Sequence, residues 1–270
     1  MKTYRSPPYV GVTGVATHEE VEHAVTCFRE AGFSMAKSHI PMLGILVSYK
    51  TLNGQATANL RYPPVERVPE LLSTASRRVL TMLHYNSRER ETLVEQIGKL
   101  FNTGDIFARD TCTALQLNIP WPEPKQVWRI KESFPRMMIV LQLSRDAMKD
   151  KTVDEICRRT SEYAGMTHYA LIDPSSGAGR PFDFKHSRAV FEGLRKHCPT
   201  LAVGLAGGFD GSNVEERVTM LEPHIGLEFC IDAEGGVRDK RSDEYGDDTY
   251  HREKVKAYID AAGRAFLGAT

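Results

Sequence analysis

Residues 169–239 contain the segments that decide the fold of this chain. They read Tyr-Ala-Leu-Ile-Asp-Pro at 169–174, Gly-Ala-Gly-Arg-Pro-Phe-Asp-Phe at 177–184, Val-Gly-Leu-Ala-Gly-Gly at 203–208, Asn-Val at 213–214 and Glu-Gly-Gly-Val-Arg-Asp at 234–239. One apolar run ends in Asp173, and another ends in Gly207 and Gly208, where a backbone without Cβ atoms lets a ligand approach closely. A helical pattern follows Gly208, and the free amides at a helix start can receive an anion. The stretch predicts an acid beside an anion-binding loop.

The same alternation of apolar runs and amphipathic helical patterns continues through the rest of the chain. Strands are predicted at 9–15, 41–49, 77–85, 112–119, 137–143, 168–173, 201–206 and 227–231. Helices are predicted at 18–32, 65–76, 87–100, 124–133, 184–197, 213–221 and 253–266, and the segment 146–165 is expected to contain a further helix. Eight such alternations in 270 residues favour an α/β fold, a single (β/α)8 barrel of the TIM-barrel type. An open doubly wound sheet is the alternative. We expect one domain over residues 1–270, with the acidic segment 239–248 as a solvated loop.

Composition and charge narrow the classes of partner. The chain has 35 basic and 35 acidic residues, so it has no long-range field that would gather nucleic acid or anionic lipid. Its five cysteines form no Cys-x-x-Cys pair, which argues against a disulfide framework and a structural zinc site and indicates a reducing cytoplasm. No apolar run approaches the ~20 residues of a membrane span. We expect a cytoplasmic protein with a small-molecule substrate and neither a nucleic-acid nor a membrane partner, and we leave a homodimer open.

In a barrel of this type the ligand lies at the carboxyl ends of the strands. That rule selects Thr13, Ser48 or Lys50, His84 with Asn86, Asn118, Gln142, Asp173, Gly207 with Gly208, and Cys230 with Asp232 and Glu234. His84 is a candidate acid or base because the ordinary pKa of histidine lies near neutrality, although a histidine at a strand end is also commonly a buried structural residue. Asp232 and Glu234 are either a working carboxylate pair or two solvated loop acids. No metal-ligand spacing is present, and we expect no metal and no cofactor.

These segments resemble the phosphoribosylanthranilate isomerases of tryptophan biosynthesis. The matching pieces in the last third occur in the family's order, and weaker matches are Gln116-Leu117, Arg61-Tyr62-Pro63 and Gly14. The resemblance implies an Amadori rearrangement of an aldose-amine phosphate in which a strand-six aspartate, matched by Asp173, protonates the ring oxygen. It also implies that Arg61 faces a substrate carboxylate and that Gly207 and Gly208 help to hold phosphate.

Two positions depart from the family pattern. Thr13 stands where the family has a cysteine that moves the carbon-bound proton, and a hydroxyl does not ionise near neutral pH; a lost base costs ~10²–10⁴ in rate. Asp232 falls in the segment where the family has a phosphate-binding glycine. Either its carboxylate faces the anion, at a cost of roughly 1–4 kcal/mol at ~4 Å, or it points aside, or the substrate has no phosphate.

The sequence therefore predicts an isomerase-like enzyme acting on a sugar-linked or sugar-phosphate small molecule. The reaction would be acid–base isomerisation, ring opening or a related lyase step, with Asp173 as general acid. The alternative is a catalytically silent paralogue that binds a small metabolite. The candidate catalytic residues are Asp173, His84 and Thr13, and the candidate substrate-binding residues are Arg61, Gln116, Gly207, Gly208, Asp232 and Glu234.

Overall fold

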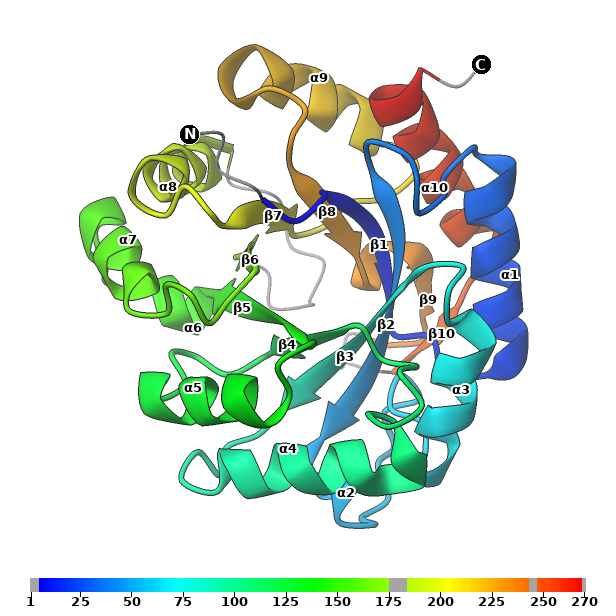
Figure 1. Ribbon diagram of the computed structural model, residues 1–270. Coiled ribbons are helices and arrows are strands. Elements are labelled where there is room, and N and C mark those ends of the chain that lie inside the picture. Colours follow the sequence, from blue (N-terminus) through cyan, green and yellow to red (C-terminus); the bar gives the residue numbers. More distant parts are fainter. Residues whose placement is uncertain (1–4, 175–183, 243–246, 269–270) are drawn as a thin grey trace.

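The computed structural model describes residues 5–174, 184–242 and 247–268. Eight parallel strands close into a barrel in chain order, with β1 paired to both β2 and β8 (Figure 1). The strands are β1 (Tyr9–Thr13), β2 (Ile40–Ser48), β3 (Leu80–Asn86), β4 (Ala114–Leu117), β5 (Met138–Ser144), β6 (Tyr169–Asp173), β7 (Ala202–Ala206) and β8 (Cys230–Ala233). The predicted closed barrel is confirmed, and the open sheet is excluded.

Helices surround the barrel (Figure 1). They are α1 (His18–Glu30), α2 (Tyr49–Leu52), α3 (Val68–Ala75), α4 (Leu93–Asn102), α5 (Pro124–Ser133), α6 (Arg145–Met148), α7 (Val153–Ser161), α8 (Phe184–His197), α9 (Val214–Ile225) and α10 (Arg252–Leu267), with the 3-10 turns η1 (Val65–Arg67), η2 (Thr103–Asp105) and η3 (Gly235–Val237). Across the described ranges, none of these helices has the length and apolar character needed to cross a membrane.

The segment 146–165 contains the predicted helix as α7, and the short helix α6 precedes it. Asp150 between them has a φ of 56°, which ends helical geometry. Thr152 then starts α7 with a capping box, in which its side chain accepts from the backbone N–H of Glu155 and the Glu155 side chain accepts from the N–H of Thr152. The capping box at Thr152 thus sets where the predicted helix begins within this segment.

Side chains that point into the barrel change character along its axis. Toward the amino ends of the strands they form an apolar core that consists of Tyr9, Ile40, Met42, Leu80, Met82, Ala114, Val140, Tyr169, Ala202 and Cys230, and Leu171 and Ala206 extend this core up to the inner end of the site. Alternate residues of a strand face the same side, so the next inward positions lie nearer the carboxyl ends. There the buried side chains are polar, and include Thr13, His84, Gln116, Gln142, Asp173 and Asp232. This polar end positions the candidate site.

Strand β8 begins later than the sequence pattern indicated. The apolar run 227–231 predicted the strand, whereas β8 covers Cys230–Ala233. Its register is set by the neighbouring strands: Asp232 lies beside Ala206 of β7 and Gly11 of β1. Asp232 is therefore an inward-facing strand residue and not a residue of the following loop.

The prediction of a solvated loop over 239–248 is also wrong. Strand β9 (Arg238–Lys240) pairs antiparallel with β10 (Asp248–Tyr250). Asp248 is only 2% exposed, because two arginine side chains surround its carboxylate. An acidic segment is expected to be solvated unless a basic side chain from elsewhere in the chain binds it. Here Arg61, 187 residues away, binds Asp248.

Candidate active site at the carboxyl end of the barrel

Seven of the nine predicted site residues line one small buried cavity inside the barrel, which we call the inner cavity. Its lining consists of His84, Gln116, Gln142, Leu171, Asp173, Ala206, Gly207, Gly208, Asp232, Glu234 and Gly235. Its volume is about 20 Å³, which suffices for about one water molecule. The other two predicted residues contact this lining: Thr13 through Asp232, and Arg61 through Glu234. The structure thus brings together all nine side chains or glycines.

Asp232 occupies the β8 side of the inner cavity. Thr13 Oγ1 lies 2.9 Å from Asp232 Oδ1 and 3.0 Å from Oδ2, so the threonine hydroxyl donates to the carboxyl group. Burial raises the pKa of Asp232 well above its ordinary value, and the nearby charges of Glu234 and Asp173 act in the same direction against the Thr13 hydrogen bond. Asp232 therefore keeps its proton at a pH where exposed aspartates are ionised. The contact assigns Thr13 a positioning role toward Asp232.

Asp173 ends β6 on another side of the same cavity and is 4% exposed. Gln142 Nε2 donates a hydrogen bond of 2.8 Å to Asp173 Oδ2. This contact helps to orient the carboxyl group of Asp173. The glycine-rich motif predicted at 177–183 lies outside the described residues.

His84 on β3 presents an imidazole without a charge. Burial lowers its pKa to about 3, so the ring is neutral near neutral pH. Gln116 Nε2 lies 3.1 Å from His84 Nδ1 and 2.8 Å from Asn118 Oδ1; since an amide nitrogen donates, Nδ1 accepts and Nε2 carries the hydrogen. His84 Nε2 and Gln116 Oε1 are buried without a hydrogen-bond partner in the part of the chain that the structure describes. A buried donor and acceptor of this kind are suited to a polar ligand.

Gly44 on β2 makes the space in which Thr13 and His84 lie. A Cβ atom at Gly44 would be 2.5 Å from Thr13 Oγ1 and 2.6 Å from His84 Nε2, closer than real Cβ atoms approach. Any other residue at position 44 would displace one of these two side chains. The glycine is thus a requirement of the site, and the sequence pattern did not single it out.

Arg61, predicted to face a substrate carboxylate, already contacts two carboxylates of this chain. Its guanidinium pairs with Asp248 and Glu234, while Arg238 Nε binds the same Asp248 and Arg238 Nη1 donates to the carbonyl of Gly14 at 3.0 Å. We call Arg61, Asp248 and Arg238 the arginine cluster. Glu234 joins this cluster to the inner cavity. Sequence reasoning missed Asp248 and gave no role to Arg238.

The glycine pair after β7 is held by side chains from α9. Gly207 and Gly208 have φ values of 113° and 67°, and their carbonyls accept from Arg217 and Asn213 at 3.0 Å each. Beyond Gly208 lies a second cavity of about 430 Å³, lined by Gly208, Asp210, Gly235, Gly236, Arg238, Asp239, Lys240 and Lys254. Asp232 does not line this cavity. Asp232 lines the inner cavity instead.

A third cavity of about 370 Å³ forms the outer mouth of the site and shares Gln142 and Glu234 with the inner cavity. Its other lining residues are Tyr62, Asn86, Ser87, Arg88, Arg90, Asn118, Pro120, Ser144 and Asp146. Most of them follow β3, β4 and β5, and sequence reasoning named only Asn86 and Asn118. The remaining residues belong to no strand-end motif, and only their position just after a predicted strand could have indicated that they line the site. Within the described residues, no group of three His, Cys, Asp or Glu side chains could hold a metal ion.

Comparisons with known proteins find similarity at the level of structure. No protein-family profile and no curated protein sequence matches the chain. The fold is similar to phosphoribosyl anthranilate isomerase from Thermus thermophilus, with 17% identity, coverage of 94% of this chain and 98% of that chain, and a TM-score of 0.58. The corresponding protein from Thermotoga maritima has 15% identity, 95% and 99% coverage and a TM-score of 0.57. Tryptophan synthase subunit alpha from Legionella pneumophila has 10% identity, 97% and 94% coverage and a TM-score of 0.58. At these identities the similarity shows a shared barrel fold.

Proposed function

We propose that the protein is an isomerase-like enzyme that acts on a sugar-linked or sugar-phosphate small molecule, with Asp173 as general acid. The reaction is an isomerisation, a ring opening or a related lyase step. The observation that carries the proposal is that the carboxyl groups of Asp173, Asp232 and Glu234 line one buried cavity beside a neutral imidazole. The names of the similar isomerase structures agree with this chemistry but do not decide it.

Carboxyl groups that share a buried cavity hold protons more tightly than solvated ones, because like charges repel and burial disfavours ionisation. The pKa of Asp232 is raised by its burial and by the charges of Glu234 and Asp173, so Asp232 is the group that holds such a proton. Asp173 lies in the same cavity, where the Gln142 amide donates to its carboxyl group. Asp173 could protonate a ring oxygen or a leaving oxygen, which is the role of a general acid.

His84 and Gln116 provide the polar groups that a hydroxylated substrate requires. The Nε2–H of a neutral imidazole can donate to a hydroxyl or carbonyl oxygen, and the free Gln116 Oε1 can accept from a hydroxyl. A neutral imidazole stabilises a developing negative charge on oxygen without a fixed positive charge of its own. His84 on β3 and Gln116 on β4 thus give the cavity one donor and one acceptor. Asp173 on β6 and Asp232 on β8 lie on the other side of the barrel.

An anionic group of the substrate would occupy the 430 Å³ cavity beyond Gly208. Its lining combines three glycine backbones with Lys240, Lys254 and Arg238, against the acids Asp210 and Asp239. Lys254 and Arg238 already have carboxylate partners, so Lys240 is the cation best able to respond to an added anion. In this scheme Lys240→Gln weakens binding of a phosphorylated ligand and leaves its unphosphorylated analogue unaffected.

The test is solvent exchange. Aldose phosphates, ketose phosphates and N-linked aryl glycosides are screened for binding by thermal shift, and each ligand is then incubated in D2O while proton NMR follows loss of its carbon-bound protons. Asp173→Asn should lower the exchange rate by ~10²–10⁴ with nearly unchanged affinity, whereas Asp154→Asn, an exposed acid on α7, should have no effect. Undiminished exchange in Asp173→Asn would refute the acid role.

A second candidate function is a catalytically silent protein that binds a metabolite. The observation that favours it is Thr13, whose hydroxyl donates to Asp232 and offers no thiolate to move a carbon-bound proton. Tight binding of a screened ligand without any proton exchange in the wild type would support this candidate over the enzyme.

A further inference from the structure

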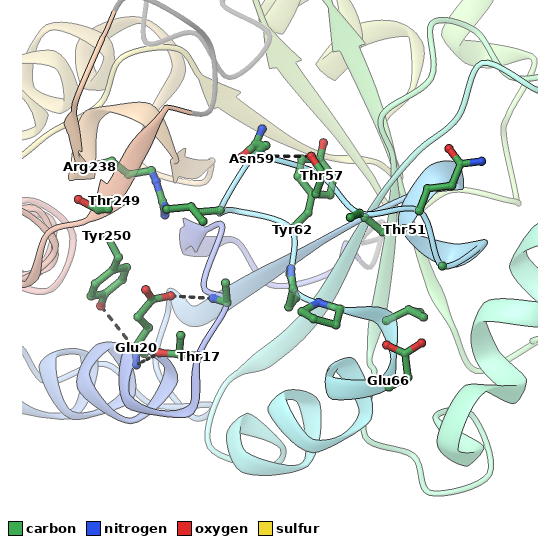
Figure 2. A pocket seen from close by; sticks show the side chains of 18 residues that line it. Thr17, Glu20, Thr51, Thr57, Asn59, Tyr62, Glu66, Arg238, Thr249 and Tyr250 are labelled. Carbon is green, nitrogen blue, oxygen red and sulfur yellow. Dashed lines mark hydrogen bonds between the residues drawn. The ribbon is translucent and has the colours of Figure 1, made fainter.

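A further cavity lies on the flank of the barrel and not on its axis. It measures about 600 Å³ and lies between the start of α1, the segment 54–66 and the β9–β10 hairpin (Figure 2). Cavities of this size hold small-molecule ligands in other proteins. We call it the flank cavity. It shares Arg238 with the arginine cluster and Tyr62 with the outer mouth, but none of its lining belongs to the inner cavity.

Most of the flank cavity's wall is apolar or aromatic. Segment 54–66 contributes Ala56, Leu60, Pro63, Pro64 and Val65, and the rings of Tyr62 and Tyr250 line it from this segment and from β10. Leu60 is 51% exposed, and it is one of four exposed large hydrophobic side chains among the described residues. A ligand with an apolar body would cover this side chain.

The charged groups of the flank cavity are predominantly acidic. Glu20 on α1 and Glu66 on η1 carry carboxylates, and Arg238 is the one basic side chain in the described lining. The guanidinium of Arg238 is already bound to Asp248 and to the carbonyl of Gly14. Its charge is therefore matched by Asp248, and the cavity retains the charge of the glutamates.

Glu20 is the acid best placed to receive a ligand. Figure 2 shows it between Thr17 and the hairpin residues Thr249 and Tyr250. Its carboxylate accepts a hydrogen bond from the backbone N–H of Ala16. That hydrogen bond joins Ala16 N to Glu20 Oε2 at 2.7 Å. Burial raises the pKa of Glu20 even though the N–H groups of Ala16 and Thr17 and the charge of Arg238 oppose it, so these groups do not fully offset the cost of burying the carboxylate.

We propose that the flank cavity is a binding site for a small organic amine, whose ammonium group contacts Glu20 and whose apolar body lies against Leu60 and the prolines of segment 54–66. An ammonium group supplies a further counter-charge through a charge-assisted hydrogen bond. The faces of Tyr62 and Tyr250 favour a cation over an anion, because aromatic rings are negative on their faces. The proposal is independent of the reaction at the inner cavity.

The experiment measures binding of three probes of similar shape by isothermal titration calorimetry: phenethylamine, 2-phenylethanol and 3-phenylpropionate. Phenethylamine should bind saturably, 2-phenylethanol about tenfold more weakly, and 3-phenylpropionate more weakly still, where a tenfold change corresponds to about 1.4 kcal/mol. Equal affinities for the three probes, or no saturable binding of the amine, would overturn the proposal.

Variants locate the site. Glu20→Gln should weaken phenethylamine about tenfold and leave 2-phenylethanol unchanged, whereas Glu19→Gln, the adjacent exposed acid outside the lining, should change neither. Leu60→Ala, which alters an exposed loop side chain and is expected to fold, should weaken both probes in parallel. Equal effects of the two glutamate variants would contradict the site. Asp173→Asn should bind phenethylamine as the wild type does, so that failure of the proposed reaction and failure of this site can be told apart.

Discussion

Two buried aspartates in this protein occupy opposite electrostatic environments. Asp248 in the arginine cluster binds two guanidinium groups, while Asp232 in the inner cavity is held by the Thr13 hydroxyl and faces two other acids. Burial acts to raise both pKa values, and for Asp248 it is the largest single influence. There the hydrogen bonds and charges of Arg61 and Arg238 together outweigh it, so the pKa of Asp248 is lowered, whereas the pKa of Asp232 is raised.

The difference separates a structural cluster from a reactive one. In the arginine cluster Arg61 and Arg238 both donate to Asp248, and Arg238 also donates to the carbonyl of Gly14. The cluster thereby connects the segment before η1 to the β9–β10 hairpin and to the turn at Gly14. In the inner cavity His84 Nε2 and Gln116 Oε1 are buried without partners among the described residues, and Asp232 keeps a proton. Satisfied buried charges stabilise a fold, whereas unsatisfied polar groups around a cavity are typical of a site that binds a ligand.

The largest expected effect is loss of the arginine cluster's central acid. Asp248→Asn removes the counter-charge of two buried arginines and should lower the free energy of unfolding by about 3–5 kcal/mol. Urea denaturation at neutral pH measures this change. Asp239→Asn, which removes a half-exposed partner of Lys254, serves as the control and should cost less than about 1 kcal/mol. Similar losses for both variants would mean that the arginine cluster contributes no more than a surface pair.

A smaller effect is expected from filling the space beneath the inner cavity. Gly44→Ala places a methyl group against Thr13 Oγ1 and His84 Nε2, both side-chain atoms that can move at a cost, and should lower the free energy of unfolding by about 1–3 kcal/mol. It should also weaken any inner-cavity ligand. Gly98→Ala on α4, where a Cβ meets nothing within 4 Å, is the matched control and should be neutral or slightly stabilising. Unchanged stability and binding in Gly44→Ala would show that the Thr13 and His84 positions are not fixed.

The two aspartates should also give opposite changes of stability with pH. The lowered pKa of Asp248 contributes stability that is present above the unfolded-state pKa and is lost as the pH falls through the folded-state value. The raised pKa of Asp232 means that the folded state binds more protons, so its contribution falls as the pH rises from the unfolded-state pKa toward the folded-state value.

Urea unfolding of wild type, Asp248→Asn and Asp232→Asn from acid to mildly alkaline pH checks both signs. The advantage of the wild type over Asp248→Asn should grow as the pH rises, and any advantage over Asp232→Asn should shrink or reverse. Parallel curves for the two variants would contradict the assignment of opposite environments.

Much of the fold could be predicted because strand and helix periodicity are local properties of the chain. The helices 124–133 and 184–197 have the predicted bounds, and Asp173 ends its strand as expected. The start of β8 could not be predicted from local periodicity, because its pairing with β1 and β7 sets where the strand begins. That shift of register decides that Asp232 faces the barrel interior.

The candidate site was predictable as a set of strand-end residues, but its chemistry was not. The partners of Arg61 and Thr13 lie 187 and 219 residues away along the chain, so no local pattern reveals them. The neutral state of His84 follows from complete burial, which depends on the surrounding strands. Gln116 and His84 were named separately, whereas their contact, which fixes the histidine tautomer, appears only in the folded structure.

The most direct test of the account is a carbon-13 NMR titration of the aspartate side-chain carboxyl groups from about pH 2 to about pH 9, with Asp232→Asn and Asp248→Asn used to assign the two signals. We predict that Asp232 remains protonated after the exposed aspartates have ionised, and that Asp248 ionises before them. Ionisation of Asp232 together with the exposed aspartates would contradict the claim that the inner cavity retains a proton for acid–base chemistry.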